Sequence, residues 1–366
     1  MSLHGNPGME YVRRNMKKRK IYTMRDLAEI AGVSHMTVSR VFRNHPSVKA
    51  ETRERILALA AEHDFRPHPV LSMAMAIRTN QRATSPTPHA TLAWVHSNQQ
   101  EDAWQTLPHL KPYLEGLREH TASMGFGLDT FWIGKGGLSG KRFCDILTAR
   151  GISGCIIAPP PGNLKHLHLR WADFSWVTFH HDSWRPLLHR VANDANYSLG
   201  KSLRELRRLG YQRIGLAIAE NLNVKSEFAY QGRYLVAAER YPQITWCPPL
   251  FYPQTEIHDA APLFKAWLKE HRPEVVVCND VHTRQLLEDW GYQIPEDIGL
   301  VHLSLGPDTP NWTGMRLEAS RMGAACVDLL LSQIQHNQRG VPKAPYETLL
   351  RALWVKGDTT RMHAHD

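Results

Sequence analysis

Features that mark exported, membrane-spanning or zinc-binding proteins are missing from this sequence. The five cysteines are odd in number, scattered and never spaced as a CxxC pair, which argues against a disulfide framework and against a zinc site. Apolar runs such as residues 155–161 are far shorter than the roughly 20 residues that cross a bilayer. The basic residues near the start have no apolar stretch behind them, as a signal peptide would. We therefore expect a cytoplasmic protein without a membrane partner.

Motifs that hold cofactors or perform catalysis are also missing. The segment GKGGLSGK (134–141) has no Ser or Thr after its last lysine, so it does not match a phosphate-binding loop, and no GxGxxG follows a strand. None of the 21 histidines lies in an HExxH motif or beside a cysteine pair, which favours surface or core histidines over metal ligands. No Ser-His-Asp grouping is recognisable. We expect no enzymatic activity, no metal and no cofactor.

What the sequence does contain is a strongly uneven charge. The chain has 366 residues and a net charge of +9. Residues 1–85 hold 15 Lys and Arg against 7 Asp and Glu, whereas residues 86–366 hold 29 against 28. A short basic module on a nearly neutral body is typical of a nucleic-acid-binding protein with a separate second function. A basic disordered tail would explain residues 13–20 but not the patterned sequence that follows them.

The chain divides into segments of different character. Residues 1–20 are polar and basic, so we expect a disordered tail. Residues 21–66 indicate three short helices, and residues 67–89 hold four prolines around a Met-rich stretch, which is typical of a linker. Residues 90–358 form the body, and we expect residues 359–366 to be a second tail.

The body alternates between predicted strands and predicted helices. Short apolar runs indicate strands at 90–97, 126–133, 152–159, 175–181, 213–220, 274–280 and 298–305. Amphipathic stretches indicate helices at 110–124, 140–150, 198–209, 262–271 and 282–290. Alternation of this kind predicts an α/β fold in which mostly parallel sheets are covered by helices on both faces. The number of units suggests two such subdomains.

The strongest signal lies in residues 23–44, TMRDLAEIAGVSHMTVSRVFRN. Thr23 is a good N-cap with Asp26 at the capping-box position, Gly32 ends the first helix, and Ser34 caps the second. Two helices joined by so tight a turn form a helix-turn-helix. Its second helix packs one face on the first helix and presents the other to a DNA major groove.

The polar face of this second helix carries side chains that can contact bases. Arg40 can bind guanine through two hydrogen bonds, His35 can donate to a base or a phosphate, and Met36 can contact a thymine methyl. Short hydroxyl side chains suited to phosphates are Ser34, Thr37 and Ser39. The alternative is a three-helix interaction module that binds no DNA, which the charge asymmetry disfavours.

The motif resembles the DNA-binding headpiece of the LacI family of bacterial transcription regulators. The residues that carry the resemblance are AGVS (31–34), TVSRV (37–41), ETRERI (51–56) and FRP (65–67). Further pieces follow in the same order over nearly all of the chain, namely ISGCIIAPP, VANDANYSLGKSLRELRRLGYQRIGL, CND, YQIPEDIGLV and GDTT. An ordered match of this length is more specific than the helix-turn-helix alone.

The resemblance implies a headpiece, a hinge helix within residues 67–89, and a two-lobed body similar to periplasmic sugar-binding proteins. By position, lobe one would comprise residues 90–188 and 316–342, and lobe two residues 189–315 and 343–358. Members of this family bind a small effector between the lobes and form dimers. Two headpieces then read a pseudo-palindromic operator, in most members to repress transcription.

The resemblance also assigns roles within the headpiece. His35 and Met36 match the family's main specificity pair, and Arg40 matches its base-reading arginine. The expected phosphate contacts are Thr23, Ser34, Thr37, Ser39, Arg43 and Thr52. This chain departs from the family at three positions, because Arg43 replaces an asparagine, Lys49 replaces a serine cap, and Phe65 replaces a tyrosine.

The hinge is a further departure from the family. Its members insert a leucine from each subunit into the minor groove, and Ala74 stands at that position here. Alanine is too short to act as a wedge, whereas Met73 or Met75 would serve if the hinge shifts by one residue. The other interpretation is that Leu71 and its apolar neighbours form a dimer-packing stripe.

A ligand site between lobes needs polar groups at the strand ends. By position, the expected effector-binding residues are His96, Ser97, His180, Glu227, Asn279 and Ser304. Of these, Asn279 keeps the residue type common among sugar-binding members, whereas His180, Glu227 and Ser304 change the chemistry. We therefore expect a ligand that is not held in the common hexose mode, although a carbohydrate remains open, as does a member without a ligand.

Two functions from different classes follow. The first is a transcription regulator whose DNA affinity responds to a small molecule. The second is a small-molecule-binding protein, with sugar-like ligands, whose headpiece is incidental or degenerate.

Overall fold

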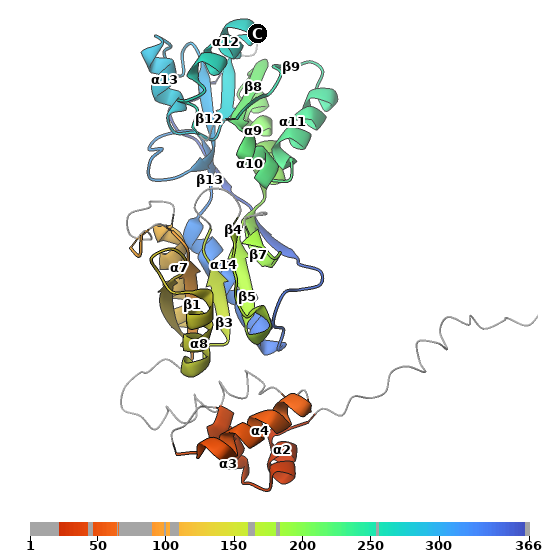
Figure 1. Cartoon of the computed structure of the whole chain (residues 1–366). Coiled ribbons are helices and arrows are strands. Elements are labelled where there is room, and N and C mark those ends of the chain that lie inside the picture. Colours follow the sequence, from red (N-terminus) through yellow and green to blue (C-terminus); the bar gives the residue numbers. More distant parts are fainter. Residues whose placement is uncertain are drawn as a thin grey trace, which may run out of the picture. The chain divides into compact units, whose positions relative to one another are not determined.

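The structure is a computed structural model that describes residues 22–42, 47–63, 65, 90–98, 100–102, 110–159, 165–180, 184–253 and 256–362. The chain forms two compact units, residues 1–82 and residues 83–366. The first unit contains the headpiece, and the second contains the body (Figure 1). In the part of the chain that the structure describes, no helix has both the length and the apolar composition needed to span a bilayer.

The headpiece consists of helices α2 (Met24–Ala31), α3 (His35–Phe42) and α4 (Ala50–Glu62). The capping box of α2 forms as predicted, because Asp26 N donates to Thr23 Oγ1 at 3.2 Å and Thr23 N donates to Asp26 Oδ2 at 2.6 Å. Gly32 ends α2 with a φ of 61°, a left-handed conformation that glycine adopts without strain. These two signals confirm the predicted bounds of the first helix.

The three helices enclose a small core that fixes which face of α3 is exposed. Leu27, Val38 and Ile56, one from each helix, are completely buried. Arg55 of α4 donates to the main-chain oxygen of Ala31 at 3.1 Å and so ties α4 to the end of α2. Because Val38 and its neighbours fill this core, the opposite side of α3 is left for solvent or DNA.

Lobe one is built on a six-stranded parallel sheet in the order β14-β7-β5-β3-β1-β2. Its strands are β1 (Thr91–His96), β2 (Gly127–Trp132), β3 (Gly154–Ile157), β5 (Ser175–Phe179), β7 (His189–Asn193) and β14 (Glu347–Leu350). Its helices are α7 (Lys111–Ser123), α8 (Gly140–Arg150) and α14 (Ala319–Gln335). A short 3₁₀ turn, Trp171–Asp173, and the paired strands β4 (Lys165–His166) and β6 (Trp184–Arg185) complete it.

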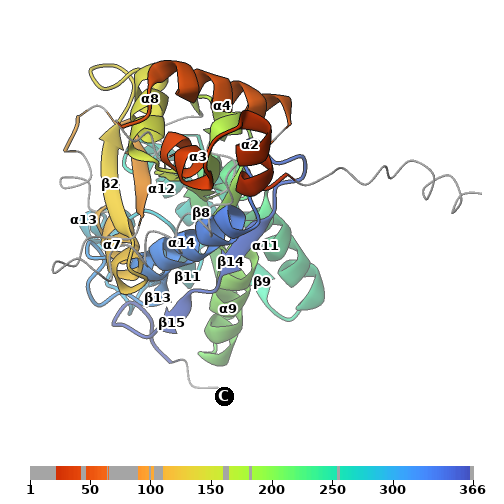
Figure 2. The same ribbon diagram turned by 90° about the horizontal axis from the view of Figure 1, so that it is seen from below.

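Helices cover both faces of this sheet. On one face α8 packs through Phe143 and Leu147 against Ala93 and Val95 of β1. On the other face α7 and α14 lie side by side (Figure 2). A Cβ at Gly116 of α7 would come within 2.1 Å of the main-chain oxygen of Ser320, so glycine permits this close approach.

Lobe two is built on a second sheet in the order β10-β8-β11-β12-β13-β15, with β9 beside β8. All of its pairs are parallel except β13 with β15. Its strands are β8 (Arg213–Ala219), β9 (Thr245–Trp246), β10 (Leu250–Tyr252), β11 (Val275–Cys278), β12 (Gly299–Leu305), β13 (Gly314–Arg316) and β15 (Leu353–Val355). Its helices are α9 (Ala195–Arg208), α10 (Glu220–Lys225), α11 (Ala229–Arg240), α12 (Ala261–His271) and α13 (Thr283–Asp289).

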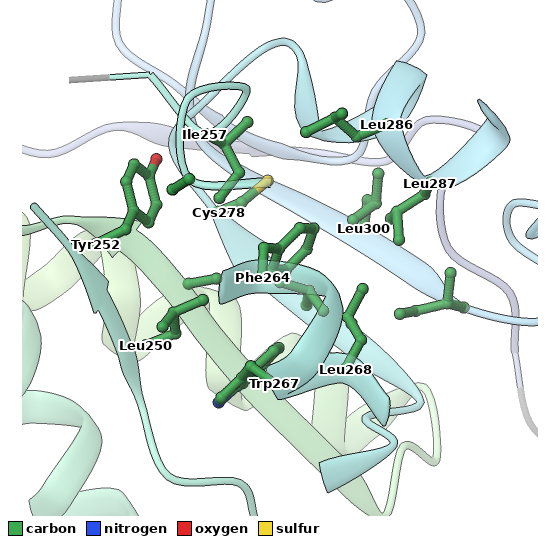
Figure 3. Close-up of a cluster of buried hydrophobic side chains, with 14 of the residues drawn as sticks. Leu250, Tyr252, Ile257, Phe264, Trp267, Leu268, Cys278, Leu286, Leu287 and Leu300 are labelled. Atoms are coloured by element: carbon green, nitrogen blue, oxygen red, sulfur yellow. The ribbon is translucent and has the colours of Figure 1, made fainter. Parts of the chain in front are cut away.

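Lobe two also has a hydrophobic core on each face of its sheet. On one face, Phe264 and Trp267 of α12 pack with Leu286 of α13 over Cys278 and Leu300 of the sheet (Figure 3). On the other face, the leucines of α9, which contains the helix predicted at 198–209, pack with α11 on alternate residues of β11. Parallel sheets with helices on both faces, in two subdomains, confirm the predicted fold class.

Three expected boundaries are corrected by the structure. Residues 189–193 form β7, which pairs with β5 and therefore belongs to lobe one rather than lobe two. Residues 347–350 form β14, which pairs with β7 and also belongs to lobe one. The chain therefore crosses between lobes at the ends of these strands, about residues 194 and 351, because each strand completes its pairing before it leaves the sheet.

The third correction concerns the expected tail from residue 359. Thr359 and Thr360 are buried in lobe two. Thr359 Oγ1 donates to the main-chain oxygen of Leu300 at 2.7 Å, and Arg361 N donates to Tyr211 Oη at 3.1 Å. These hydrogen bonds make residues 359–361 part of the packed lobe rather than a tail.

Candidate nucleic-acid interface and ligand-binding residues

The exposed face of α3 carries the three side chains predicted to read bases. Met36 is 55% exposed, Arg40 is exposed and His35 is half-buried. Arg40 makes no hydrogen bond or ion pair within the described residues, so its guanidinium is available for a partner with two acceptors. A helix that presents an apolar side chain and a free arginine on one face has the chemistry needed to contact base edges.

The beginning of α3 carries two of the predicted phosphate contacts. Ser34 Oγ accepts from Thr37 N at 3.1 Å, which caps the helix as expected, and lies 2.9 Å from Thr37 Oγ1. Helix N-termini carry unsatisfied N–H groups and a partial positive charge that favour phosphate. The two hydroxyls and the start of the helix therefore form one polar end of the headpiece.

The structure corrects the expectation for Ser39. Its side chain is only 5% exposed, so it does not lie on the surface where a phosphate would be contacted. On α3, Ser39 lies between Met36 and Phe42, three residues from each, and Phe42 packs against the headpiece core. Burial at the edge of the core therefore removes this hydroxyl from the candidate interface.

Of the remaining predicted phosphate contacts in the headpiece, the structure describes Thr23 and Thr52. Thr23 is exposed, but its side chain takes part in the capping box of α2. Thr52 is half-buried in the first turn of α4, and the Lys49 side chain makes no capping hydrogen bond there. Predicted contacts that lie outside the described residues are Arg43, Leu71, Met73, Ala74 and Met75.

In lobe one, the expected effector residues lie at the carboxyl ends of β1 and β5. His96 is the last residue of β1 and is almost completely buried; burial lowers the pKa of its imidazole, which the main chain of Glu101 partly offsets. Ser97 follows it and is half-buried. His180 follows β5 with a φ of 60°, and its Nε2 lies 3.1 Å from Tyr113 Oη. Because β1 and β5 both flank β3, the two histidines lie at the same edge of the sheet.

In lobe two, the expected residues lie on the neighbouring strands β11 and β12. Asn279 follows β11, and its Oδ1 accepts from Ala219 N at 3.1 Å and from Tyr252 Oη at 3.3 Å. The Asn279 amide therefore ties three strand ends together, a structural role that the sequence did not indicate. The side chain of Ser304, near the end of β12, is exposed.

His302 lies two residues before Ser304 and was not predicted from the sequence. Its ring is 2% exposed, packs edge-on against Trp312, and accepts from Ser304 N at 3.2 Å through Nδ1. Burial lowers the pKa of His302 to about 4, which keeps the ring neutral. The alternation of β12 was the available signal, because it places residue 302 and residue 304 on the same side of the strand.

Glu227 lies between α10 and α11 rather than at the end of a strand. It has a φ of 53°, its carboxylate is largely exposed, and its Oε1 lies 3.4 Å from Nη2 of Arg190. Arg190 lies on β7 and also pairs with Glu347 of β14. The arginine is 11% exposed, so this cluster is a partly buried ionic connection from lobe one to lobe two. Sequence reasoning found Glu227 but missed Arg190 and Glu347.

A cavity of about 500 Å³ lies elsewhere in lobe two. It is lined by the loop after β12, by Arg316 at the end of β13, and by the end of β15 with residues 356–358. No residue predicted to bind the effector lines it. Within the described residues, no group of three or more His, Cys, Asp or Glu side chains is arranged to hold a metal ion.

Comparisons with known families agree with the two units of the fold. Residues 23–68 match the bacterial regulatory proteins of the lacI family, and residues 203–360 match the periplasmic binding protein-like domain. The transcriptional repressor PurR of Haemophilus influenzae (strain PittEE) is 21% identical over 332 residues, covering 87% of this chain and 93% of the relative. The probable transcriptional repressor ExuR of Bacillus subtilis (strain 168) is 44% identical over 46 residues, 13% of this chain and 14% of the relative.

Solved structures share the fold over most of the chain. The lac repressor dimer bound to operator and the anti-inducer ONPF is 20% identical, with a TM-score of 0.52, over 93% of this chain and 100% of that chain. A LacI transcriptional regulator from a Rhodococcus species is 18% identical, with a TM-score of 0.56, over 75% of this chain and 100% of that chain. With its helix-turn-helix headpiece and two-lobed body, the chain is a DNA-binding transcription regulator of the lacI family of bacterial regulatory proteins.

Proposed function

We propose that this chain represses transcription in the cytoplasm by binding a pseudo-palindromic operator as a homodimer, and that it has no enzymatic activity. The observation that carries the proposal is the exposed face of α3, with His35, Met36 and Arg40 beside the polar helix start at Ser34 and Thr37. Two such helices related by a two-fold axis would read two half-sites about one helical turn of DNA apart. Repression is supported by the relative PurR, which is named a repressor.

We further propose that a small molecule with several hydroxyl groups, of the carbohydrate class, binds between the lobes and changes the affinity for DNA. The contacts would come from His96, Ser97, His180, Glu227, Asn279 and Ser304. A neutral imidazole offers one donor and one acceptor, and Ser304 offers a free hydroxyl, which suits hydroxyl groups better than a charged ligand. The periplasmic-binding-protein-like match over residues 203–360 supports a ligand of this kind.

Footprinting of the DNA that flanks the protein's own gene tests the proposal. We expect one protected pseudo-palindrome with wild-type protein. Arg40→Ala should lower affinity for that site at least about fivefold while affinity for random DNA changes much less, because a two-bond contact to guanine contributes about 1–3 kcal/mol of discrimination. The matched control is Arg240→Ala, which removes an exposed arginine of α11 and should leave the footprint unchanged.

The other function from the sequence predicts a different set of results. A small-molecule-binding protein with a degenerate headpiece would leave every DNA fragment unprotected but would bind a carbohydrate. With a panel of mono- and disaccharides, the proposed regulator should release its operator in response to one member. Ser304→Ala should abolish this release without weakening operator binding, and an unchanged release would remove Ser304 from the ligand site.

A further inference from the structure

The cavity in lobe two has the size of a small-molecule site but contains none of the effector residues discussed above. Its volume of about 500 Å³ lies within the range of about 300–1,000 Å³ that is usual for ligand pockets. The walls come from the loop between β12 and β13 and from the segment around the end of β15. The cavity is therefore a candidate ligand site that does not use the residues proposed to bind the effector.

Two cationic side chains line this cavity. Arg316 and Lys356 form no hydrogen bond or ion pair within the described residues. Asp358 is the only carboxylate among the lining residues, and its Oδ1 already lies 3.4 Å from Nη1 of Arg284. The two free cations thus leave the cavity with an excess of positive charge. Charge of one sign in a concave site attracts ligands of the opposite sign.

The walls of the cavity are held in place by hydrogen bonds. Gly306 N donates to Thr309 Oγ1 at 2.9 Å, which closes the start of the loop. Asp358 N donates to the main-chain oxygen of Asn311 at 2.7 Å, which joins the loop to the segment after β15. A Cβ at Gly357 would lie 2.0 Å from the same oxygen, so the two walls approach as closely as glycine allows. The main chain of these walls is therefore already ordered before a ligand binds.

We propose that this cavity binds a small anion that carries a phosphate or a carboxylate group, held by Arg316 and Lys356. The planar guanidinium of Arg316 can donate two parallel hydrogen bonds to two oxygens of such a group, and the ammonium of Lys356 supplies a second charge. The chain leaves lobe two after β13 and returns to it just before β15, so both lining strands lie next to connections between the lobes. The cavity can bind the anion whether or not the proposed function is correct. Only an effect of the bound anion on DNA affinity would rest on the proposed function.

Calorimetric titration of the full-length protein with pyrophosphate and, separately, with citrate tests the site, with ionic strength held constant by sodium chloride. We expect one of the two to bind at one site per chain, and the comparison identifies phosphate or carboxylate as the recognised group. Arg316→Gln and Lys356→Gln should each weaken that binding at least tenfold. Lys269→Gln, which removes an exposed lysine of α12, should leave it unchanged.

The thermal unfolding midpoint of each variant serves as a check on folding, because both substituted side chains lie at the surface of a cavity and not in a core. Absence of binding by both anions would overturn the proposal. So would binding that persists unchanged in both cavity variants, since the anion would then bind elsewhere. If the wild-type protein binds one of the anions but protects no DNA site in the footprinting experiment, the proposed function is contradicted and the anion site is not.

Discussion

At the scale of single residues, His302 shows how burial of one ring makes stability depend on pH. Its pKa of about 4 lies below the usual value for histidine, so between these values the unfolded chain binds more protons than the folded chain. Stability is therefore fully present above the usual histidine pKa and is lost as pH falls toward 4. Buried His96 and His189 have pKa values lowered in the same direction.

The prediction concerns urea unfolding of the full chain at two pH values. Between pH 7 and pH 5, protonation of His302 in the unfolded chain should remove about 2 kcal/mol of unfolding free energy. Over the same pH interval, the unfolding free energy of His302→Gln should fall by about 2 kcal/mol less than that of the wild type. His258→Gln, at an exposed position, is the control and should lose as much as the wild type. Equal losses in all three proteins would contradict the burial argument.

Residue roles were only partly predictable, for reasons that Ser39 and Arg190 illustrate. A helical pattern places Met36 and Arg40 on the polar face correctly, but it does not tell whether a small residue at the edge of that face is covered. Arg190 was overlooked because the sequence pattern predicted no strand at residues 189–193, where the structure has β7. It is buried here because Glu347 lies on the neighbouring strand, 157 residues later in the sequence.

At the scale of elements, the caps of the headpiece helices explain where α2 and α4 begin and how stable the first turn of each helix is. Thr23 satisfies a free N–H group of α2, whereas Lys49 provides no side-chain acceptor for α4. A lysine also places a positive charge at the positive end of the helix dipole, which is unfavourable. We infer that the start of α4 is the weaker of the two.

This difference predicts that Lys49→Ser stabilises α4. A serine cap contributes about 1 kcal/mol, so amide hydrogen exchange in the first turns of α4 should slow about fivefold. The measurement is exchange at peptide level in the full chain. Lys49→Ala removes the same charge without supplying an acceptor, and it should give a clearly smaller effect. The same slowing in both variants would show that charge, and not capping, limits the helix.

Long elements with regular patterns were predicted closely, and short or polar ones were not. The bounds of α8 agree with the predicted 140–150, and every predicted strand contains a strand of the structure. β13, β14 and β15 were missed because none of them is the continuous run of four buried residues that forms the equally short β3 and β11. α14 was missed because its buried residues lie on several sides of the helix, which packs against both α7 and the sheet.

At the scale of the whole molecule, the two lobes are each assembled from distant parts of the sequence. Lobe one takes its last helix and its edge strand from residues 319–350, after the chain has built most of lobe two. Local patterns cannot indicate such returns, and the resemblance to a known family supplied them, with errors of about five to eight residues at the crossings. The connections between lobes, such as Arg190 with Glu227, could be found only from the structure.

The charge distribution also acts at this scale. Nearly all of the net charge of +9 belongs to the first 85 residues, whereas the rest of the chain is almost neutral. If these residues neutralise DNA phosphates, each contact releases counterions, and affinity then falls steeply with salt. The same charge on a headpiece that does not dock would give only weak binding without preference for sequence.

The most direct test of a DNA-binding regulator is therefore the affinity of the full-length protein for its protected DNA site as a function of salt. For several phosphate contacts per dimer, the affinity should fall at least about a hundredfold between about 50 and 200 mM salt, and linearly on a double logarithmic plot. At each salt concentration it should exceed the affinity for random DNA at least about a thousandfold. Equal affinity for both DNAs, or an affinity that salt does not change, would contradict the account.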